Sequence, residues 1–372
     1  MSVFWNTRTK NLSPYTPGEQ PKDRKFIKLN TNENPYPPSP KVIEAIQKAA
    51  NENLRLYPDP QCTEFREAVA ARYSVRPEQV FAGNGSDEIL AFAFGAFFEN
   101  GENAEKILFP DITYSFYPVY AGLWNNPYRT IPLSEDFFIN INDYKIPSGG
   151  VIFPNPNAPT GTAVLLDDIL SLAEYLEKRE KVLIVDEAYA AFAACAAYAA
   201  HAAFGAQTAI PHINKYANLL TVHTLSKSAS LAGLRVGFAI GNEKLIEGLC
   251  RIRDSFNSYT LDRLALAGAV AAVKDAAYYD EINNRVTATR EKTAQALRGL
   301  GFSVLPSSAN FLFVKPPGIS GAEFFAALRE KGILVRHFNK DRIADFLRIS
   351  IGTDDDMDAL IGACGEILRN KQ

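Results

Sequence analysis

The sequence predicts an α/β protein in which a large domain, built on a mostly parallel sheet covered by helices, carries a smaller α+β domain. Short apolar segments with strand character alternate with helical patterns from residue 42 to about residue 260. This alternation is typical of a parallel sheet with helical crossovers. The chain has 372 residues, which is more than one ordinary core accommodates. We therefore expect two packed units.

The strands of the large domain are expected where short apolar runs occur, and helices where apolar residues recur every three or four positions. The predicted strands cover 80–82, 106–109, 150–153, 182–185, 219–223 and 235–240. Helices are expected at 40–51 and 61–73. The smaller domain should follow a long helical region at 262–300, with strands at 302–305, 311–314, 333–336 and 347–351 and a helix at 321–331.

The first 40 residues are rich in proline, asparagine and threonine and show little periodicity. We expect an extended arm there rather than packed helices. Arms of this kind often reach a neighbouring subunit. The predicted organisation is thus an arm at 1–40, a large domain at 41–260, and a connecting helix with a small domain at 261–372.

Composition excludes several classes of partner. The net charge of -3 and the pI near 5.9 provide no field that would hold nucleic acid or an acidic membrane surface. The four cysteines lie far apart without a C-x-x-C pair, so we expect neither a disulfide framework nor a metal site. A reducing cytoplasm fits this pattern, and the N-terminus lacks the order of a signal peptide.

One segment, 188–206, is long enough to be considered as a membrane span. It is dominated by alanine, contains His201, and directly follows Asp186 and Glu187. A segment of this composition is a poor membrane span, so we expect no contact with a membrane.

Four motifs fall at the ends of predicted strands, where sheets of this class bind ligands. The first, G-N-G-S-D-E at 83–88, opens an apolar helical run. Its glycines allow a tight turn, and amides at the start of a helix can hold a phosphate. An ordinary turn with Ser86 or Asp87 as the helix N-cap explains the same residues.

The second motif, V-D-E-A-Y at 185–189, places Asp186 at the end of an apolar strand. A carboxylate in that position can hold a protonated ring nitrogen of a cofactor. A surface aspartate that caps the next element fits equally well.

The third motif, T-L-S-K at 224–227, ends on Lys227 and is followed by Arg235. A lysine amine forms a Schiff base when burial or neighbouring cations lower its pKa. Thr224, Ser226 and Arg235 can all bind a phosphate. Most single lysines after a strand are only solvated, so Lys227 is distinguished by these neighbours.

The fourth motif, P-N-P-N-A-P-T-G at 154–161, is dense in proline and glycine. This composition fixes a rigid turn, with a cis bond expected at Pro159, that can hold an asparagine amide at the edge of a cofactor. A plain connecting turn is the alternative.

In this order, the four motifs resemble those of the fold type I pyridoxal-phosphate aminotransferases, and the resemblance spans essentially the whole chain. It implies pyridoxal 5'-phosphate as the cofactor, with Lys227 carrying the Schiff base, Asp186 the pyridine nitrogen and Tyr189 the phenolic oxygen. The remaining cofactor contacts that it implies are the phosphate ligands Gly85, Ser86, Asp87, Thr224, Ser226 and Arg235, and Tyr114 stacked on the ring.

Two features depart from that family. Related chains usually have asparagine directly before the proline of P-T-G, whereas this chain has Ala158. We expect Asn157 to take over the contact with the cofactor oxygen. The alanine-rich run at 190–206 is longer than the family pattern leads us to expect.

Within the family, three segments resemble the histidinol-phosphate aminotransferases. They are N-L-S-P-Y-T-P-G at 11–18, K-L-N-T-N-E-N-P-Y-P-P-S-P at 28–40 and R-L-Y-P-D-P at 55–60. This resemblance implies a homodimer in which the arm and Tyr57 cross the interface, with Tyr57 reaching the cofactor phosphate of the other subunit. It also implies four substrate contacts, namely Tyr15, Asn34, Arg336 and Arg348.

The implied reaction is the reversible transfer of an amino group between histidinol phosphate and 2-oxoglutarate, giving imidazole-acetol phosphate and glutamate, in histidine biosynthesis. An aromatic amino-acid aminotransferase and a pyridoxal-phosphate-dependent phospho-amino-acid decarboxylase share these motifs and stay open as alternatives. A non-catalytic nucleotide-binding protein is a more distant alternative, because the sequence contains no G-x-x-x-x-G-K-[ST].

Overall fold

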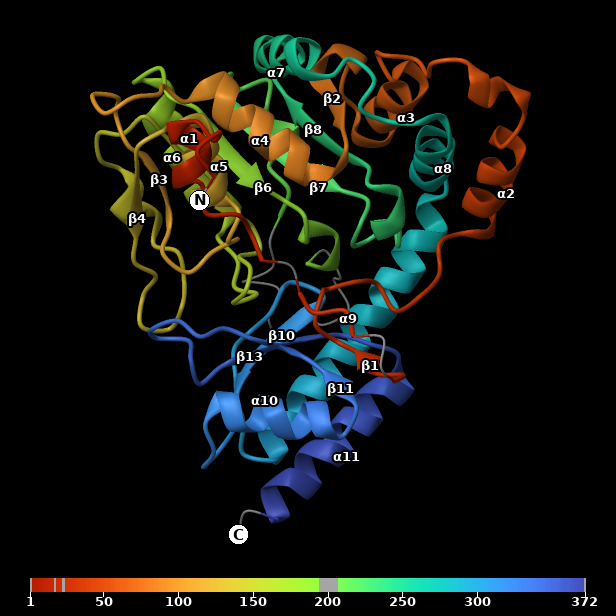
Figure 1. Cartoon of the computed structure of the whole chain (residues 1–372), viewed down its shortest axis with the longest axis vertical. Coiled ribbons are helices and arrows are strands. Elements are labelled where there is room, and N and C mark those ends of the chain that lie inside the picture. Colours follow the sequence, from red (N-terminus) through yellow and green to blue (C-terminus); the bar gives the residue numbers. More distant parts are fainter. Residues whose placement is uncertain (1, 17, 22–23, 194–206, 371–372) are drawn as a thin grey trace.

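The computed structural model describes residues 2–16, 18–21, 24–193 and 207–370. A seven-stranded sheet forms the upper part of the molecule in Figure 1, with the order β2-β8-β7-β6-β5-β3-β4. β8 runs antiparallel to both neighbours, whereas the other pairs are parallel. The predicted fold class is confirmed. The strands are β2 (Val80–Gly83), β3 (Ile107–Pro110), β4 (Tyr128–Ile131), β5 (Gly150–Pro154), β6 (Leu183–Asp186), β7 (Leu219–Thr224) and β8 (Gly237–Gly241).

Alternate residues of these strands point to opposite faces of the sheet, and both faces are covered by helices. On β6, Ile184 packs in one core cluster while Leu183 and Val185 pack in another. Burial on both faces explains why the central strands are apolar throughout. The first face packs against α4 (Gly85–Phe97), α5 (Tyr117–Trp124) and α7 (Glu243–Phe256). The second packs against α3 (Thr63–Tyr73), α6 (Leu166–Glu177) and α8 (Arg263–Lys274), and α2 (Pro40–Ala49) packs on α8.

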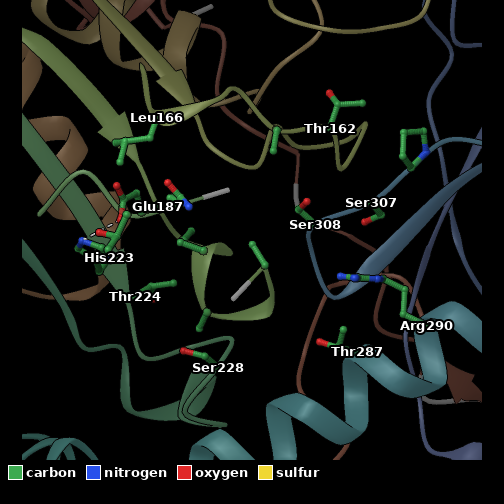
Figure 2. A pocket seen from close by; sticks show the side chains of 18 of the residues that line it. Thr162, Leu166, Glu187, His223, Thr224, Ser228, Thr287, Arg290, Ser307 and Ser308 are labelled. Carbon is green, nitrogen blue, oxygen red and sulfur yellow. Dashed lines mark ion pairs between the residues drawn. The ribbon is translucent and has the colours of Figure 1, made fainter. Parts of the chain in front are cut away.

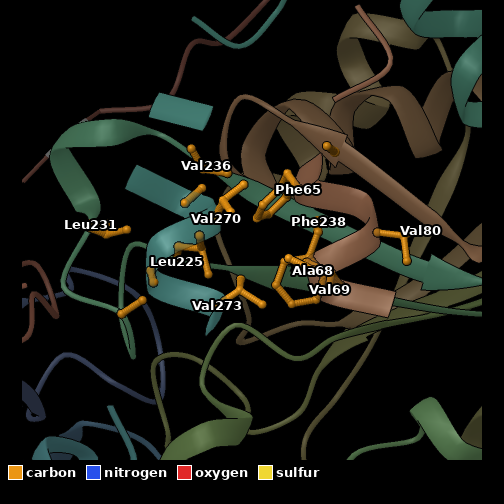
Figure 3. Packing of buried hydrophobic residues seen from close by; sticks show 14 of the residues in the cluster. Phe65, Ala68, Val69, Val80, Leu225, Leu231, Val236, Phe238, Val270 and Val273 are labelled. Atoms are coloured by element: carbon orange, nitrogen blue, oxygen red, sulfur yellow. The ribbon is translucent and has the colours of Figure 1, made fainter. Parts of the chain in front are cut away.

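Figure 3 shows how the second face is closed above β8. Phe65 and Val69 of α3 meet Phe238 of β8, and Val270 of α8 lies beside them. Phe65 and Phe238 make an edge contact with their ring centroids 6.2 Å apart. Large buried side chains of this kind each contribute about 1.5–3 kcal/mol of burial free energy, so they hold the strand ends in fixed positions.

A smaller unit lies below the large sheet in Figure 1. Its antiparallel sheet has the order β12-β13-β10-β9, and a separate parallel pair joins β1 to β11. Leu347 and Phe311 are among the buried residues that pack against its helices. Its elements are β1 (Ile27–Lys28), β9 (Ser303–Val304), β10 (Phe311–Lys315), α10 (Gly321–Glu330), β11 (Ile333–Leu334), β12 (Arg336–His337), β13 (Leu347–Ser350) and α11 (Asp354–Arg369).

The connection between the two units differs from the single long helix that the sequence predicts. Two helices, α8 and α9 (Ala276–Gly299), meet at Asp275. The Asp275 carboxylate accepts hydrogen bonds from Ser39 Oγ and from Lys41 Nζ. The start of α2 therefore holds Asp275 at the point where the helical path breaks. The predicted domain boundaries at residues 40 and 260 stay predictions.

The expected strand at 333–336 is also divided, because Ile333 and Leu334 pair with β1 whereas Arg336 and His337 pair with β13. The arm is not wholly extended, since it contains a short helix, α1 (Thr7–Asn11), capped by the Asn6 side chain. Most of the alanine-rich run, 194–206, lies outside the described residues. Within the described ranges, no helix combines the length and the apolar character that a membrane crossing requires.

Candidate active site

A cavity of about 160 Å³ lies where β5, β6 and β7 end. β8 is antiparallel, so its first residues reach the same edge, and Arg235, two residues before β8, lies there too. The cavity therefore brings together predicted residues from the arm, from the large sheet and from the small unit. They are Tyr15, Ser86, Asp87, Tyr114, Asp186, Tyr189, Thr224, Ser226, Lys227, Arg235, Arg336 and Arg348.

Lys227 follows β7 and extends its amine into this cavity. The Nζ atom donates a hydrogen bond to the main-chain oxygen of Thr31 over 2.9 Å. Burial lowers the pKa of Lys227 from 10.5 to about 8, and the nearby Arg348 guanidinium acts in the same direction. A larger fraction of this amine is thus neutral near pH 7 than for an exposed lysine.

Asp186 is the last residue of β6 and is 4% exposed. Its carboxylate accepts hydrogen bonds from the Tyr117 hydroxyl (3.2 Å) and the Ala188 amide (3.2 Å). Burial raises the pKa of this carboxyl to about 7. Within the described chain no cationic side chain pairs with it. A buried carboxylate without a counterion is costly, so this position suits a cationic ring nitrogen.

Arg235, Ser226 and the start of α4 form a region that favours anions. Arg235 Nη1 donates to Ser226 Oγ over 3.2 Å, and Nη2 donates to Asp87 Oδ2 over 3.0 Å. Gly85 has a φ of +75°, and a Cβ atom at that position would lie 2.6 Å from Arg235 Nη2. Glycine is therefore required for the guanidinium to approach the first turn of α4, where free amides and the helix dipole favour a phosphate.

Tyr114 lies in the same wall and donates a hydrogen bond from its hydroxyl to Asp87 Oδ1 over 2.6 Å. The Asp87 carboxylate is thus occupied by Tyr114 and Arg235. What remains available for an anion at Asp87 is its main-chain amide. The hydrogen bond also fixes the Tyr114 ring at the cavity wall, where a planar ligand could stack on it.

The mouth of the cavity carries Tyr15, Arg336 and Arg348. The Tyr15 ring stacks on Phe116 with centroids 4.3 Å apart. Arg336 Nη2 donates to the Thr16 oxygen over 3.5 Å, and Arg348 Nη2 donates to the Asn30 oxygen over 3.0 Å. The two guanidiniums lie on neighbouring strands, with Arg336 paired to Arg348 in the β12–β13 register. Two adjacent cations suit an anionic substrate group.

Four predicted residues lie outside the cavity wall. Asn157 is fully buried behind it, with Nδ2 donating to the Ile112 oxygen (3.0 Å) and Thr160 Oγ1 (2.9 Å), and Ala158 takes the place in the wall. Asn34 Nδ2 donates to the Lys227 oxygen over 3.3 Å. Gly85 packs directly against the Arg235 guanidinium. Tyr57 is 79% exposed, and its ring stacks on Tyr259.

Sequence reasoning missed Asn30, Thr31 and Asn32, which also line the cavity. The available signal was the polar segment L-N-T-N-E-N, which has the asparagine content of a turn and contains Asn34, a predicted substrate contact. The bonds of this segment to Lys227 and Tyr189 join residues far apart in the sequence.

A larger cavity of about 760 Å³ lies nearby (Figure 2). Glu187 and His223 line one side of it and Arg290 of α9 lines the other. Burial raises the pKa of Glu187 to about 7 and lowers the pKa of His223 to about 3, so charge is disfavoured on both despite the 3.7 Å between Glu187 Oε2 and His223 Nε2. Neither Lys227 nor Asp186 reaches this cavity, and we place the active site in the smaller one.

Comparison with known proteins identifies the family of the chain. The family described as aminotransferase class I and II matches residues 24–363. The chain is 50% identical over 372 residues to a histidinol-phosphate aminotransferase of Clostridium beijerinckii, covering 100% of this chain and 99% of that protein. It is 51% identical over 363 residues to one of Pseudomonas putida, covering 98% and 99%.

Solved structures share the fold at lower identity. A histidinol-phosphate aminotransferase of Sinorhizobium meliloti, solved in complex with pyridoxal-5'-phosphate, superposes with a TM-score of 0.87 at 23% identity and covers 100% of this chain and 99% of that chain. An aspartate aminotransferase variant of Thermus thermophilus gives 0.81 at 18%, covering 98% and 100%. Because the family model matches most of the chain and the identity extends over its full length, the chain belongs to the pyridoxal-phosphate-dependent aminotransferases of class I and II and, within them, to the histidinol-phosphate aminotransferases.

Proposed function

We propose that the chain transfers the amino group of histidinol phosphate to 2-oxoglutarate, giving imidazole-acetol phosphate and glutamate. One observation carries the choice of substrate: the cavity holds two separate cationic regions. Arg235 lies at the α4 end, and Arg336 and Arg348 lie at the mouth. The first suits the cofactor phosphate, and the second suits either the phosphate of the amino donor or the carboxylates of the acceptor.

The residues fit pyridoxal 5'-phosphate. Asp186 would accept the ring N–H, Tyr189 would donate to the phenolic oxygen, and Tyr114 would stack on the ring. The phosphate would bind to Arg235, Ser226 and Thr224, with the amides of Gly85, Ser86 and Asp87. Asn157 does not line the cavity and its Nδ2 donates to Ile112 and Thr160, so its expected contact with the cofactor oxygen stays a prediction. When bound, the cofactor supplies an electron sink that stabilises negative charge on the substrate carbon beside the nitrogen.

Lys227 would perform the proton transfer. Its amine is deprotonated more readily than that of an ordinary lysine because burial lowers its pKa to about 8. It can therefore take a proton from the substrate carbon and deliver it to the cofactor carbon. Asn34 holds the main chain of Lys227 through its oxygen, which limits the directions in which the amine can move.

The decisive experiment is an assay of the purified protein with pyridoxal phosphate, histidinol phosphate and 2-oxoglutarate, in which glutamate is measured. Glutamate formation that depends on histidinol phosphate is expected. Transamination of phenylalanine with no reaction of histidinol phosphate would identify an aromatic aminotransferase instead. Release of carbon dioxide from a phospho-amino acid would identify a decarboxylase.

We also propose a homodimer in which Tyr57 and the arm cross the interface. Support comes from exposed apolar side chains: Leu54 and Leu56, which precede Tyr57, are about half exposed, and Phe256 is 76% exposed. Such groups tend to be covered in an assembly. Sedimentation of the holoenzyme should give twice the chain mass, and Tyr57→Phe should weaken cofactor retention. A monomeric holoenzyme would contradict the proposal.

A cytoplasmic location completes the proposed function. The described cysteines Cys62, Cys250 and Cys364 are free thiols, which supports a reducing compartment. Fractionation of the source cells should place the activity in the cytosol.

A further inference from the structure

We propose that Asn32 is a positioning residue that forces the Tyr189 hydroxyl to donate its proton into the cavity. The proposal rests on the proposed function, because the acceptor in the cavity would be the phenolic oxygen of pyridoxal phosphate. Asn32 Nδ2 lies 2.9 Å from the Tyr189 hydroxyl oxygen, and both residues are buried. Asn32 also lines the cavity.

The direction of this hydrogen bond follows from the protons around Ser350. The Asn32 main-chain amide donates to Ser350 Oγ over 2.8 Å, so Oγ already acts as an acceptor. The single hydroxyl proton of Ser350 is then free to go to Asn32 Oδ1, which lies 2.9 Å away. With Oδ1 facing Ser350, the NH₂ group of Asn32 must face Tyr189.

The reverse orientation of the amide would leave a buried proton without an acceptor. Ser350 Oγ would then receive two N–H groups, and among the described hydrogen bonds its own proton would have no partner. Ser350 is 2% exposed. An unsatisfied buried donor is strongly disfavoured, so the network selects one orientation of the Asn32 amide.

The backbone holds Asn32 in the required place. Its φ is 57°, a left-handed conformation that asparagine adopts more readily than most residues. Asn310 Nδ2 donates to the Asn32 oxygen over 2.9 Å. Asn32 is thus fixed by its main-chain amide, its main-chain carbonyl and its side chain. Through Asn32, the small unit and the arm together set the orientation of the Tyr189 hydroxyl.

The consequence concerns the Tyr189 proton. Because the phenol oxygen accepts a hydrogen bond from Asn32, and the described hydrogen bonds include none from the Tyr189 hydroxyl to a protein acceptor, its proton can point into the cavity. A donor there would stabilise negative charge on the cofactor's phenolic oxygen. It would therefore lower the pH at which the linkage between Lys227 and the cofactor loses its proton.

Asn32→Asp tests the inference because aspartate has nearly the same shape and also tolerates a left-handed backbone. Its carboxylate can only accept, so the Tyr189 proton should turn away from the cofactor. We expect the pH midpoint of the visible absorbance band of the holoenzyme to rise by about one to two pH units, the size of one hydrogen bond to a charged group. Tyr189→Phe should raise the midpoint by a similar amount.

A double-mutant cycle separates this role from the added charge. In the Tyr189→Phe background, Asn32→Asp should shift the midpoint much less than in the wild-type background. Ser350→Ala provides a second route, since it removes the donor to Asn32 Oδ1 and should also raise the midpoint. Asn32→Gly keeps the backbone freedom but removes the N–H group that faces the Tyr189 hydroxyl. The Tyr189 proton is then no longer held toward the cavity, so the midpoint should rise, by less than in Asn32→Asp because no new acceptor is added.

Asn126→Asp is a matched control for stability. Asn126 is a buried asparagine whose Nδ2 donates to the Phe98 oxygen over 2.9 Å, outside the cavity. This variant should lose thermal stability without a spectral shift. If Asn32→Asp shifted the pH midpoint equally in the wild-type and Tyr189→Phe backgrounds, the role of Asn32 would be overturned while the proposed function would stand. A wild-type protein that binds no pyridoxal phosphate would overturn the proposed function itself.

Discussion

The amine of Lys227 donates its hydrogen bond to the main-chain oxygen of Thr31, a residue 196 positions earlier in the chain. Glu33, two residues further along the same segment, accepts from Lys28 and from the Thr31 hydroxyl, each over 2.7 Å. The segment that precedes α2 therefore surrounds the lysine with one neutral acceptor and one nearby carboxylate. The pKa of the Lys227 amine therefore depends on the negative charge of Glu33, which raises it, and on the positive charge of Arg348, which lowers it.

The rate at which apoprotein captures pyridoxal phosphate should rise with pH and level off above about 8, because the neutral amine of Lys227 is the nucleophile and its pKa is lowered to about 8. The positive charge of Arg348 lowers that pKa and the negative charge of Glu33 raises it. Arg348→Gln should therefore move the midpoint up and Glu33→Gln should move it down. Stopped-flow absorbance would measure both, and a wild-type midpoint near 10.5 would contradict the burial argument.

Asp186→Asn should lower kcat/KM by on the order of 10²–10³-fold, the effect expected when a preorganised charge is removed from a reacting system. The amide keeps the size of the side chain but cannot stabilise a protonated ring nitrogen. Tyr117→Phe is the matched control, since it removes only the hydroxyl that donates to Asp186 Oδ2. Steady-state kinetics should show a much smaller loss for Tyr117→Phe; equal losses would mean that packing, and not charge, sets the effect.

The sequence was sufficient to locate most of the cavity. Apolar runs define β5, β6 and β7, and a parallel sheet brings their carboxyl ends to one edge, so Asp186, Thr224 and Lys227 had to lie close together. Burial lowers the pKa of Lys227. The position of a motif after a strand indicates that a residue is near the sheet edge, but not how deeply its side chain is buried. The chemical roles of these residues stay predictions.

Features that depend on long-range contacts could not be predicted from the sequence. β4 was not predicted because three of its four residues are exposed and polar or aromatic. Arg235 was expected inside a strand but adopts φ 53° just before β8, where its guanidinium meets Gly85. The replacement of Asn157 by Ala158 in the cavity wall depends on the path of the turn, and that path is set by the bonds of Asn157 to Ile112 and Thr160.

Arg336→Gln should raise KM for histidinol phosphate with a smaller effect on kcat. The lost interaction is a charge-assisted hydrogen bond, worth about 1.5–3 kcal/mol, so kcat/KM should fall by roughly 10- to 150-fold. Arg342→Gln is the control, because Arg342 pairs with Asp111 over 3.1 Å outside the cavity wall. Initial-rate kinetics on both substrates would measure the change, and similar losses in the two variants would remove Arg336 from the substrate site.

Glu187→Gln should make the protein more stable at pH 8 while leaving its stability at pH 4.5 almost unchanged. Burial raises the pKa of Glu187 from 4.5 to about 7 in the folded state. A raised carboxyl pKa means that the folded state binds the extra proton, so stability is lost as pH rises from 4.5 through 7. Glutamine keeps the acceptor for the Ala209 amide, which donates to Oε1 over 2.8 Å, and removes the charge. At pH 8 the gain in unfolding free energy should reach up to roughly 3 kcal/mol.

Glu177→Gln is the matched control for that prediction. Glu177 Oε1 also accepts from a main-chain amide, that of Ala217 over 2.8 Å, but this bond lies at the surface, where water solvates the charge. Its replacement should change stability by less than about 0.5 kcal/mol at either pH. Urea unfolding of the holoenzymes at pH 4.5 and pH 8 would provide the comparison. If Glu187→Gln were less stable than the wild type at both pH values, the Glu187 carboxylate would be a favourable charged partner of His223, and the buried pair would have to be described as an ion pair.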